Sequence, residues 1–296
     1  MLAEPQPSFH PAPSRPRLRL PDGACDAHAH VFGPRTRFPF AKRRAFTPAD
    51  APKEKLFALH ARLGIQRCVV VQAVCHGFDN FVTTEAIAAR GGAYCGVAIV
   101  PVGVETTELR RLDALGFCGV RFNFLRNLGP APGIDRVLAL AGRLAGLGWH
   151  LEVQMEPERI GELGSRLKHS PVPVVIGHMG RIDASRGIDQ PDFRALLALM
   201  RDQRFWVKVS GAERVSRREA PWPDTIPFAR KLVAEFGGRV LWGTDWPHVN
   251  LAGPPPDDGQ LVDLLGEIAP SAAERHALLV DNPQRLYRFI EARVTH

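Results

Sequence analysis

The stretch ACDAHAH, residues 24–30, is the first of eight short, mostly apolar segments that alternate with helical patterns along the chain. The other seven strand-like segments cover residues 67–72, 95–100, 118–123, 149–154, 173–178, 205–210 and 239–244. The helical patterns between them fall at 53–63, 80–90, 106–115, 134–147, 157–168, 191–202 and 225–236. Strands that alternate with helices form a parallel sheet, and eight of them close a barrel. We therefore predict an α/β fold, a (β/α)8 TIM barrel. An open doubly wound sheet is the weaker alternative, because no Gly-x-Gly-x-x-Gly follows the first strand.

The length of 296 residues fits one such barrel, which needs about 250 residues. Residues 1–20 contain five prolines and no apolar core of a secretory signal. We predict a flexible, proline-rich arm over residues 1–22 and a single barrel domain over residues 23–296.

Composition narrows the class of protein further. Hydrophobic residues make up 45% and charged residues 23%, as in a soluble globular protein, and no apolar stretch is long enough for a membrane span. The five cysteines are odd in number and lack CxxC spacing, which argues against a disulfide framework or a structural zinc site and favours the cytoplasm. The net charge of +7 is scattered, so we expect a small anionic substrate rather than nucleic acid, and either a monomer or a homodimer.

Polar side chains gather where the strand-like segments end. In a barrel of this kind the chemistry lies at the C-terminal ends of the strands. The residues found there are His28, His30, the run from Gln72 to His76, the run from Arg121 to Arg126, Gln154, His178, the run from Ser210 to Arg214, and Asp245.

His28 and His30 are two residues apart on a strand, so both imidazoles project to one side. A lone histidine is more often a satisfied core residue, but His178 and Asp245 end two further strands and can meet the same point. This set could bind one divalent cation, or it could polarise a carbonyl oxygen while Asp245 acts as general base. The residues alone leave both alternatives open.

Arginines lie beside this cluster. Arg121 and Arg214 offer planar guanidinium groups that match a substrate carboxylate, and the competing interpretation for Arg214 is an ion pair with Glu213. Arg126 and Arg181 are weaker candidates at the rim. His76 follows the second strand, where lining the pocket and stabilising a turn are equally good interpretations.

Seven motifs carry a resemblance to a known family. They are DAHAHVFGP at 26–34, VVVQAVCHGFDN at 69–80, GVRFNF at 119–124, HMGR at 178–181, SGAERVS at 210–216, LWGTDWPHVN at 241–250 and DNPQRLY at 281–287. Together they resemble the amidohydrolase superfamily (amidohydrolase family 2), in the branch typified by 2-pyrone-4,6-dicarboxylate lactonase. The resemblance runs over roughly residues 23–290.

The resemblance implies a distorted TIM barrel that hydrolyses a carboxylated lactone during the breakdown of aromatic compounds. It implies catalytic roles for Asp245, His28, His30 and His178 without a required metal, and substrate binding by Arg121 and Arg214. Should one divalent metal bind, zinc or manganese, its ligands would be His28, His30, His178 and Asp245.

Three positions depart from the pattern of the lactonase branch. Phe46 and Gln154 stand where tyrosines line the substrate site, and Asn127 stands where a second arginine follows the fourth strand, with Arg126 as a neighbouring substitute. We therefore expect a related anionic substrate, such as a muconolactone with a carboxylate or sulfonate, opened by hydrolysis of its ester bond. The alternatives are a metal-dependent decarboxylase and a sugar-acid lactonase or lactone isomerase of the same superfamily.

Overall fold

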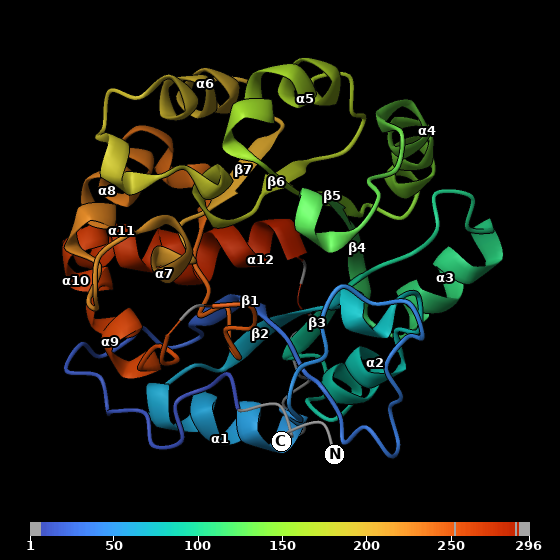
Figure 1. The fold of residues 1–296 in the computed structure, drawn as a ribbon, viewed down its shortest axis with the longest axis horizontal. Coiled ribbons are helices and arrows are strands. Elements are labelled where there is room, and N and C mark those ends of the chain that lie inside the picture. Colours follow the sequence, from blue (N-terminus) through green and yellow to red (C-terminus); the bar gives the residue numbers. More distant parts are fainter. Residues whose placement is uncertain (1–6, 252, 288, 290–296) are drawn as a thin grey trace, which may run out of the picture.

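A computed structural model of the chain describes residues 7–251, 253–287 and 289. Eight parallel strands follow one another in the order β1 to β8 and form the predicted barrel (Figure 1). Every strand lies within about two residues of a predicted segment or inside it. The strands are β1 (Cys25–Ala29), β2 (Arg67–Val71), β3 (Tyr94–Ala98), β4 (Phe117–Phe124), β5 (His150–Met155), β6 (Val174–Ile176), β7 (Phe205–Lys208) and β8 (Val240–Leu241).

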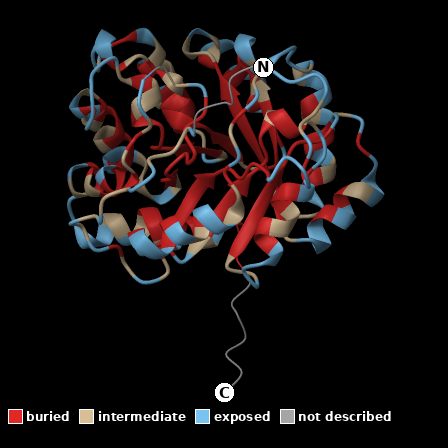
Figure 2. Cartoon of the chain, turned by 60° about the horizontal axis from the view of Figure 1, so that its bottom comes forward, coloured by how far each residue is buried: buried red, intermediate tan, exposed pale blue. Residues whose placement is uncertain are grey.

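Helices surround the barrel and cover its outer face, as Figure 1 shows. Their apolar sides pack against the strands, whereas their outer sides are exposed (Figure 2). The helices are α1 (Lys53–Leu63), α2 (Phe81–Ala88), α3 (Thr106–Ala114), α4 (Ile134–Ala145), α5 (Ile160–Leu167), α6 (Pro191–Met200), α7 (Ala212–Val215), α8 (Ile226–Phe236), α9 (Asp258–Asp263), α10 (Leu265–Ile268), α11 (Ala272–His276) and α12 (Asn282–Tyr287).

The barrel closes where the segment after β8 meets β1. The backbone N–H of Ala27 donates to the carbonyl of Trp242, and the N–H of Asp245 donates to the carbonyl of His28, both at 2.8 Å. The buried carboxylate of Asp26 accepts hydrogen bonds from the backbone N–H groups of His28 and Thr244 at 2.9 and 3.0 Å. Asp26 thus joins the first and last strands, which is the structural role that its position before His28 favours.

A bulge in β1 determines which side chains face the barrel axis. The pairing with β2 changes register between Asp26 and Ala29. Cys25 and Ala27 pack in the apolar cluster inside the barrel, yet His28, the next residue, contacts Lys208 of β7. Because a bulge adds one residue to the strand, it turns the following side chains inward.

The described part of the predicted arm lies against the barrel. The backbone N–H of Ser14 donates to Asp257 at 2.9 Å, and the N–H groups of Arg17 and Leu18 donate to Asp263 at 2.7 and 2.9 Å. Residues 1–6 lie outside the described residues. Across the described ranges, no helix has the length and apolar character required to cross a membrane.

Candidate active site

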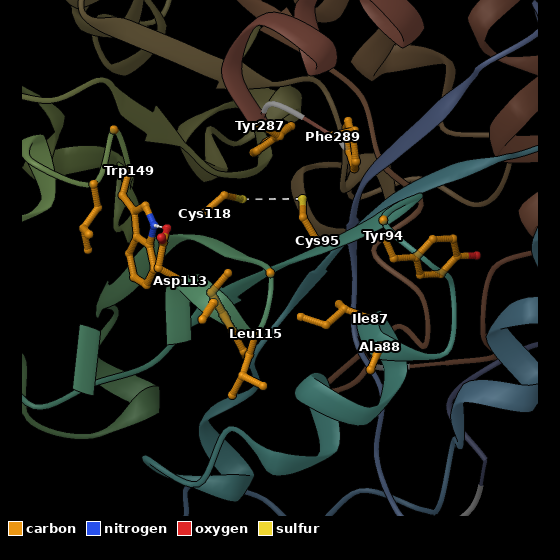
Figure 3. Close-up of a pocket in the computed structure, with 16 residues that line it drawn as sticks. Ile87, Ala88, Tyr94, Cys95, Asp113, Leu115, Cys118, Trp149, Tyr287 and Phe289 are labelled. Carbon is orange, nitrogen blue, oxygen red and sulfur yellow. Dashed lines mark hydrogen bonds between the residues drawn. The ribbon is translucent and has the colours of Figure 1, made fainter. Parts of the chain in front are cut away.

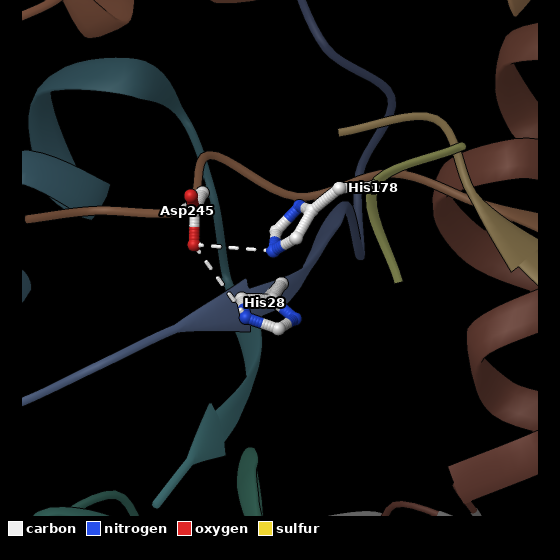
Figure 4. A group of neighbouring side chains, drawn as sticks. All are labelled: His28, His178 and Asp245. Atoms are coloured by element: carbon white, nitrogen blue, oxygen red, sulfur yellow. Dashed lines mark ion pairs between the residues drawn. The ribbon is translucent and has the colours of Figure 1, made fainter. Parts of the chain in front are cut away.

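Three histidines surround one carboxylate at the C-terminal ends of the strands. His28 lies on β1, His30 directly follows that strand, His178 follows β6, and Asp245 follows β8. The Nε2 atoms of His28, His30 and His178 lie 3.5, 3.6 and 3.6 Å from Oδ1 of Asp245. Figure 4 shows His28 and His178 directed at the carboxylate. The structure therefore brings together the four residues that the sequence assigns to one point.

The backbone at two of these residues is strained. His178 has φ 48° and Asp245 has φ 64°, a left-handed conformation that non-glycine residues rarely adopt. Such residues cost about 1–3 kcal/mol each and cluster at functional sites. The sharp turns place both side chains over the barrel axis.

Arg214 of α7 holds the carboxylate of Asp245. Its Nε donates to Oδ2, and its Nη1 donates to the carbonyl of Val249 at 3.1 Å. Burial alone would raise the pKa of Asp245, but the positive charge of Arg214, with the neighbouring imidazoles, holds it well below its usual range. Asp245 is therefore an anion with one oxygen, Oδ1, facing the histidines. The competing partner of Arg214, Glu213, lies farther away, at 3.6 Å.

The other ring nitrogen of each histidine has its own partner. Nδ1 of His28 faces Nζ of Lys208 at 3.0 Å, Nδ1 of His30 faces the carbonyl of Val71 at 2.6 Å, and Nδ1 of His178 faces the hydroxyl of Ser210 at 2.9 Å. These partners set which nitrogen carries the hydrogen.

Burial favours the neutral form of two of these rings, His28 and His178. Burial lowers the pKa of His28 well below 6.5, and the charge of Lys208 lowers it further. Burial likewise lowers the pKa of His178, although Asp245 opposes the shift. A neutral ring has one N–H, so the partner at Nδ1 determines what Nε2 offers to a substrate.

A cavity opens over this cluster and contains two further arginines. Arg121 is buried, and its Nε has no hydrogen-bond partner among the described residues. Arg181 lines the same cavity, and burial lowers the pKa of both guanidinium groups. Buried or half-buried guanidinium groups that form no ion pair with the described residues suit an anionic ligand. The cavity lining is His30, Phe46, Ala73, Val74, Arg121, Leu125, Asn127, Leu128, Gln154, His178, Arg181, Arg214, Asp245, Val249 and Asn250.

Not every expected substrate residue lies in this cavity. Phe46, Asn127 and Gln154 line it. The side chain of Arg126 is 77% exposed and pairs with Glu158 at 3.2 Å, away from the lining.

His76 is also absent from the lining. Its ring packs on Phe40, with centroids 4.9 Å apart, and on Phe32 at 6.3 Å, and its Nδ1 faces the carbonyl of Pro39 at 3.3 Å. Of the two interpretations open from the sequence, the structure therefore places His76 in loop packing.

Two buried residues that the sequence did not assign to the site, Lys208, whose direction it left open, and Glu152, contact the cluster. Lys208 points into the barrel and donates to Oε2 of Glu152 on β5 as well as facing His28. Both side chains are completely buried. The signal that could have found them is a lysine and a glutamate inside strands that are otherwise apolar, since buried charges are rare unless paired.

A second cavity of about 500 Å³ lies at the opposite end of the barrel, where β3 to β5 begin (Figure 3). Its walls are mostly apolar, and the sulfur atoms of Cys95 and Cys118 lie 3.5 Å apart there. It shares no lining residue with the cluster around Asp245.

A metal ion requires lone pairs as well as spacing. His28, His178 and Asp245 each place a ligand atom within 4.8 Å of the others, a spacing that suits one cation; His30, also expected as a ligand, is not among the three. His28 suits a cation poorly, because the ammonium of Lys208 faces its Nδ1 at 3.0 Å and can only donate, and a hydrogen bond between them occupies the Nδ1 lone pair and leaves none on Nε2. As arranged, the residues do not fit a metal bound through His28.

Two enzymes of known activity are similar in sequence to this chain. The chain is 47% identical over 284 residues to a 2-pyrone-4,6-dicarboxylate hydrolase of Comamonas testosteroni, covering 93% of both chains. It is 39% identical to a 4-sulfomuconolactone hydrolase of Hydrogenophaga intermedia, covering 92% of this chain and 90% of the other.

A solved structure from Acinetobacter baumannii, described as a probable 2-pyrone-4,6-dicarboxylic acid hydrolase with citric acid bound, is also similar. It matches with a TM-score of 0.79 at 26% identity, covering 90% of this chain and all of the other. Residues 25–289 match the family described as Amidohydrolase, which confirms the expected relationship. The chain therefore belongs to the amidohydrolase family.

Proposed function

We propose that this chain hydrolyses the ring ester of a small lactone that carries carboxylate or sulfonate groups. The observation that supports this most is the anionic Asp245 oxygen facing three imidazoles, beneath a cavity lined by Arg121 and Arg181, neither of which forms an ion pair within 4 Å with a carboxylate of the described residues. The hydrolase and sulfomuconolactone relatives act on lactones with such anionic groups.

Asp245 is the general base. Its Oδ1 takes a proton from a water molecule, whose oxygen attacks the lactone carbonyl carbon. The proton then passes from Asp245 to the ring oxygen as the ring C–O bond breaks, so one open chain carries a new hydroxyl group and a new carboxylic acid, which releases the second proton of the water to solvent and becomes a carboxylate. Because Arg214 depresses the pKa of Asp245, the base is weak, and the carbonyl must be strongly polarised.

His28 supplies that polarisation. With its hydrogen on Nε2, it donates to the carbonyl oxygen as negative charge grows there. His178 lies beside it, with ring centroids 4.6 Å apart, and can donate in the same way. Nδ1 of His30 faces the carbonyl of Val71, which orients the ring so that its Nε2 can contact the attacking water.

Arg121 and Arg181 hold the substrate anions, and Arg214 orients Asp245. This assignment differs from the expectation that Arg214 and Arg126 bind substrate, because Arg214 already pairs with Asp245 and Arg126 lies outside the cavity. Phe46 and Gln154 leave the pocket without two phenol donors, which favours a muconolactone with a sulfonate or carboxylate over the pyrone dicarboxylate.

The test measures hydrolysis of a panel of lactones by the change in absorbance. It uses the enzyme before and after treatment with a metal chelator. The panel contains 2-pyrone-4,6-dicarboxylate, 4-sulfomuconolactone, a carboxylated muconolactone and an uncharged lactone of similar size. We expect turnover of an anionic member that survives chelation, and none of the uncharged one. Asp245→Asn is the matched control and should reduce kcat by at least about 10²- to 10⁴-fold.

Product analysis distinguishes hydrolysis from the two alternative reactions, isomerisation and decarboxylation. Hydrolysis in ¹⁸O-water places one heavy oxygen in the new carboxylate. Product without heavy oxygen would instead indicate an isomerase, and carbon dioxide release would indicate a decarboxylase. Either result would overturn the proposal.

A further inference from the structure

The buried pair Lys208–Glu152 lies directly behind His28, on the side of the ring away from Asp245. Nζ of Lys208 is 3.0 Å from Nδ1 of His28 and also donates to Oε2 of Glu152. The second oxygen, Oε1 of Glu152, lies 3.4 Å from the same Nδ1 and has no hydrogen-bond partner among the described residues. Nδ1 therefore has a donor and an unused acceptor within reach.

These two neighbours favour opposite forms of the imidazole. An ammonium group has only N–H donors, so a bond from Lys208 requires the lone pair of Nδ1 and leaves the ring hydrogen on Nε2. A bond from Nδ1 to Glu152 would require the reverse, with the lone pair on Nε2. The second arrangement, a carboxylate behind a histidine, is the usual support of a metal-binding imidazole.

Distance decides between them. The contact with Lys208 has hydrogen-bond length, whereas the 3.4 Å separation from Glu152 is longer than the usual range for an N–H···O bond. The ion pair with Glu152 also fixes Lys208 in place, since both side chains are completely buried. The free nitrogen of His28, Nε2, has no partner at hydrogen-bond distance among the described residues and points toward Asp245.

We infer that Lys208, anchored by Glu152, is a positioning residue that holds the ring hydrogen of His28 on Nε2, making His28 a hydrogen-bond donor and preventing it from ligating a divalent cation. The pair thus selects between two chemistries that the same histidines and carboxylate could serve. This inference deepens the proposed function, since it explains hydrolysis without a metal. Its readouts need no substrate, so it can fail independently of the lactone assignment.

The first test is the form of His28 in the wild-type protein. Nitrogen-15 NMR of ring-labelled histidine distinguishes a nitrogen that carries hydrogen from one that does not, and the spectrum of His28→Gln identifies the His28 signals. We expect hydrogen on Nε2 and a lone pair on Nδ1. Hydrogen on Nδ1 would overturn the inference.

The second test is zinc affinity, measured by equilibrium dialysis with metal analysis of the protein. Lys208→Met removes the donor and leaves Glu152 free to accept from Nδ1. We expect zinc to bind about 10- to 100-fold more tightly than to wild type, the range that such supporting partners control. Zinc affinity equal to that of the wild type, in a folded variant, would contradict the inference.

The control variant is Lys208→Met with Glu152→Leu, which also removes the buried carboxylate. It should release the hydrogen of His28 to occupy either nitrogen and should gain less zinc affinity than Lys208→Met alone. It also covers the case in which the single variant does not fold, because no unpaired buried charge remains. Nitrogen-15 NMR of this double variant then shows which ring nitrogen of His28 carries the hydrogen. A hydrogen still confined to Nε2 would show that Lys208 does not hold it there.

Discussion

Arg181 and Arg126 are both arginines near the mouth of the barrel, but their surroundings differ. Arg181 lines the cavity over Asp245 and is half-buried, whereas Arg126 is exposed and paired with Glu158. A pair of this kind at the surface contributes at most about 1 kcal/mol. The two residues therefore form a matched test of which guanidinium contacts the substrate.

Replacing Arg181 by Met should raise KM for an anionic lactone about 10- to 150-fold, because a charge-assisted contact contributes about 1.5–3 kcal/mol. Arg126→Met should leave KM within about threefold of wild type. Steady-state kinetics of both variants on one substrate makes the comparison. Equal effects of the two substitutions would contradict the assignment.

Arg214 acts through Asp245 in our proposal. Replacing Arg214 by Met should therefore lower kcat more than it raises KM, because the carboxylate loses the partner that orients it and keeps it charged. The split between kcat and KM is the measurement. A rise in KM alone would return Arg214 to the substrate-binding role that its position first suggested.

At the scale of elements, the positions of the strands could be predicted from the sequence. The directions in which their side chains point could be predicted only in part. Each apolar run is short and flanked by a helical pattern, and the alternation alone gives the barrel. The direction of Lys208 depends on which face of β7 points into the barrel. Trp206, two residues earlier on the strand, packs in the interior cluster, so Lys208 shares the inward face. The sequence does not tell which of the two faces points inward, and only the structure shows it. Likewise, the loop after β4 turns Arg126 outward, and only tertiary packing determines that.

The junction of β8 with β1 imposes a requirement on Gly243. A Cβ at this position would lie 2.5 Å from the backbone nitrogen of His28 and 2.8 Å from Oδ1 of Asp26. These atoms belong to the closure of the barrel and cannot move without breaking it. Only glycine therefore fits at this position, where the segment after β8 lies against β1.

Gly243→Ala should destabilise the protein by about 1–3 kcal/mol, the usual cost of overpacking a close contact. Gly266→Ala in α10 is the control, because a Cβ there meets no atom within 4 Å and alanine favours the helix by up to about 1 kcal/mol. Urea denaturation of both variants measures the difference. A Gly243→Ala protein as stable as wild type would show that the junction is looser than described.

For the molecule as a whole, a buried histidine couples global stability to pH. His248 lies between Asp258 of α9, at 3.1 Å, and Glu213 of α7, at 3.6 Å. Burial alone would lower its pKa, but these two carboxylates raise it to about 10 from 6.5. Because the pKa is raised in the folded state, the stabilisation is complete below about pH 6.5 and is lost as the pH rises toward 10.

The free energy of unfolding should therefore fall more steeply between pH 7 and about 10 in the wild type than in His248→Gln. His276→Gln, which replaces an exposed histidine, should keep the wild-type slope. Urea titrations at several pH values provide these slopes. Parallel slopes for wild type and His248→Gln would show that His248 does not carry this charge.

The closure of the barrel by its first and last strands also affects when the site can form during synthesis. Asp26 and Thr244 are 218 residues apart, and the ribosome adds about 5–20 residues per second, so the partner strand emerges about 10–45 s after the first. The contacts of Ser14 and Arg17 with Asp257 and Asp263 form later still, because α9 follows Thr244 in the chain. His28 and His30 therefore lack Asp245 on a nascent chain, and the hydrolytic centre is completed in one late step, when the end of the chain returns to its beginning.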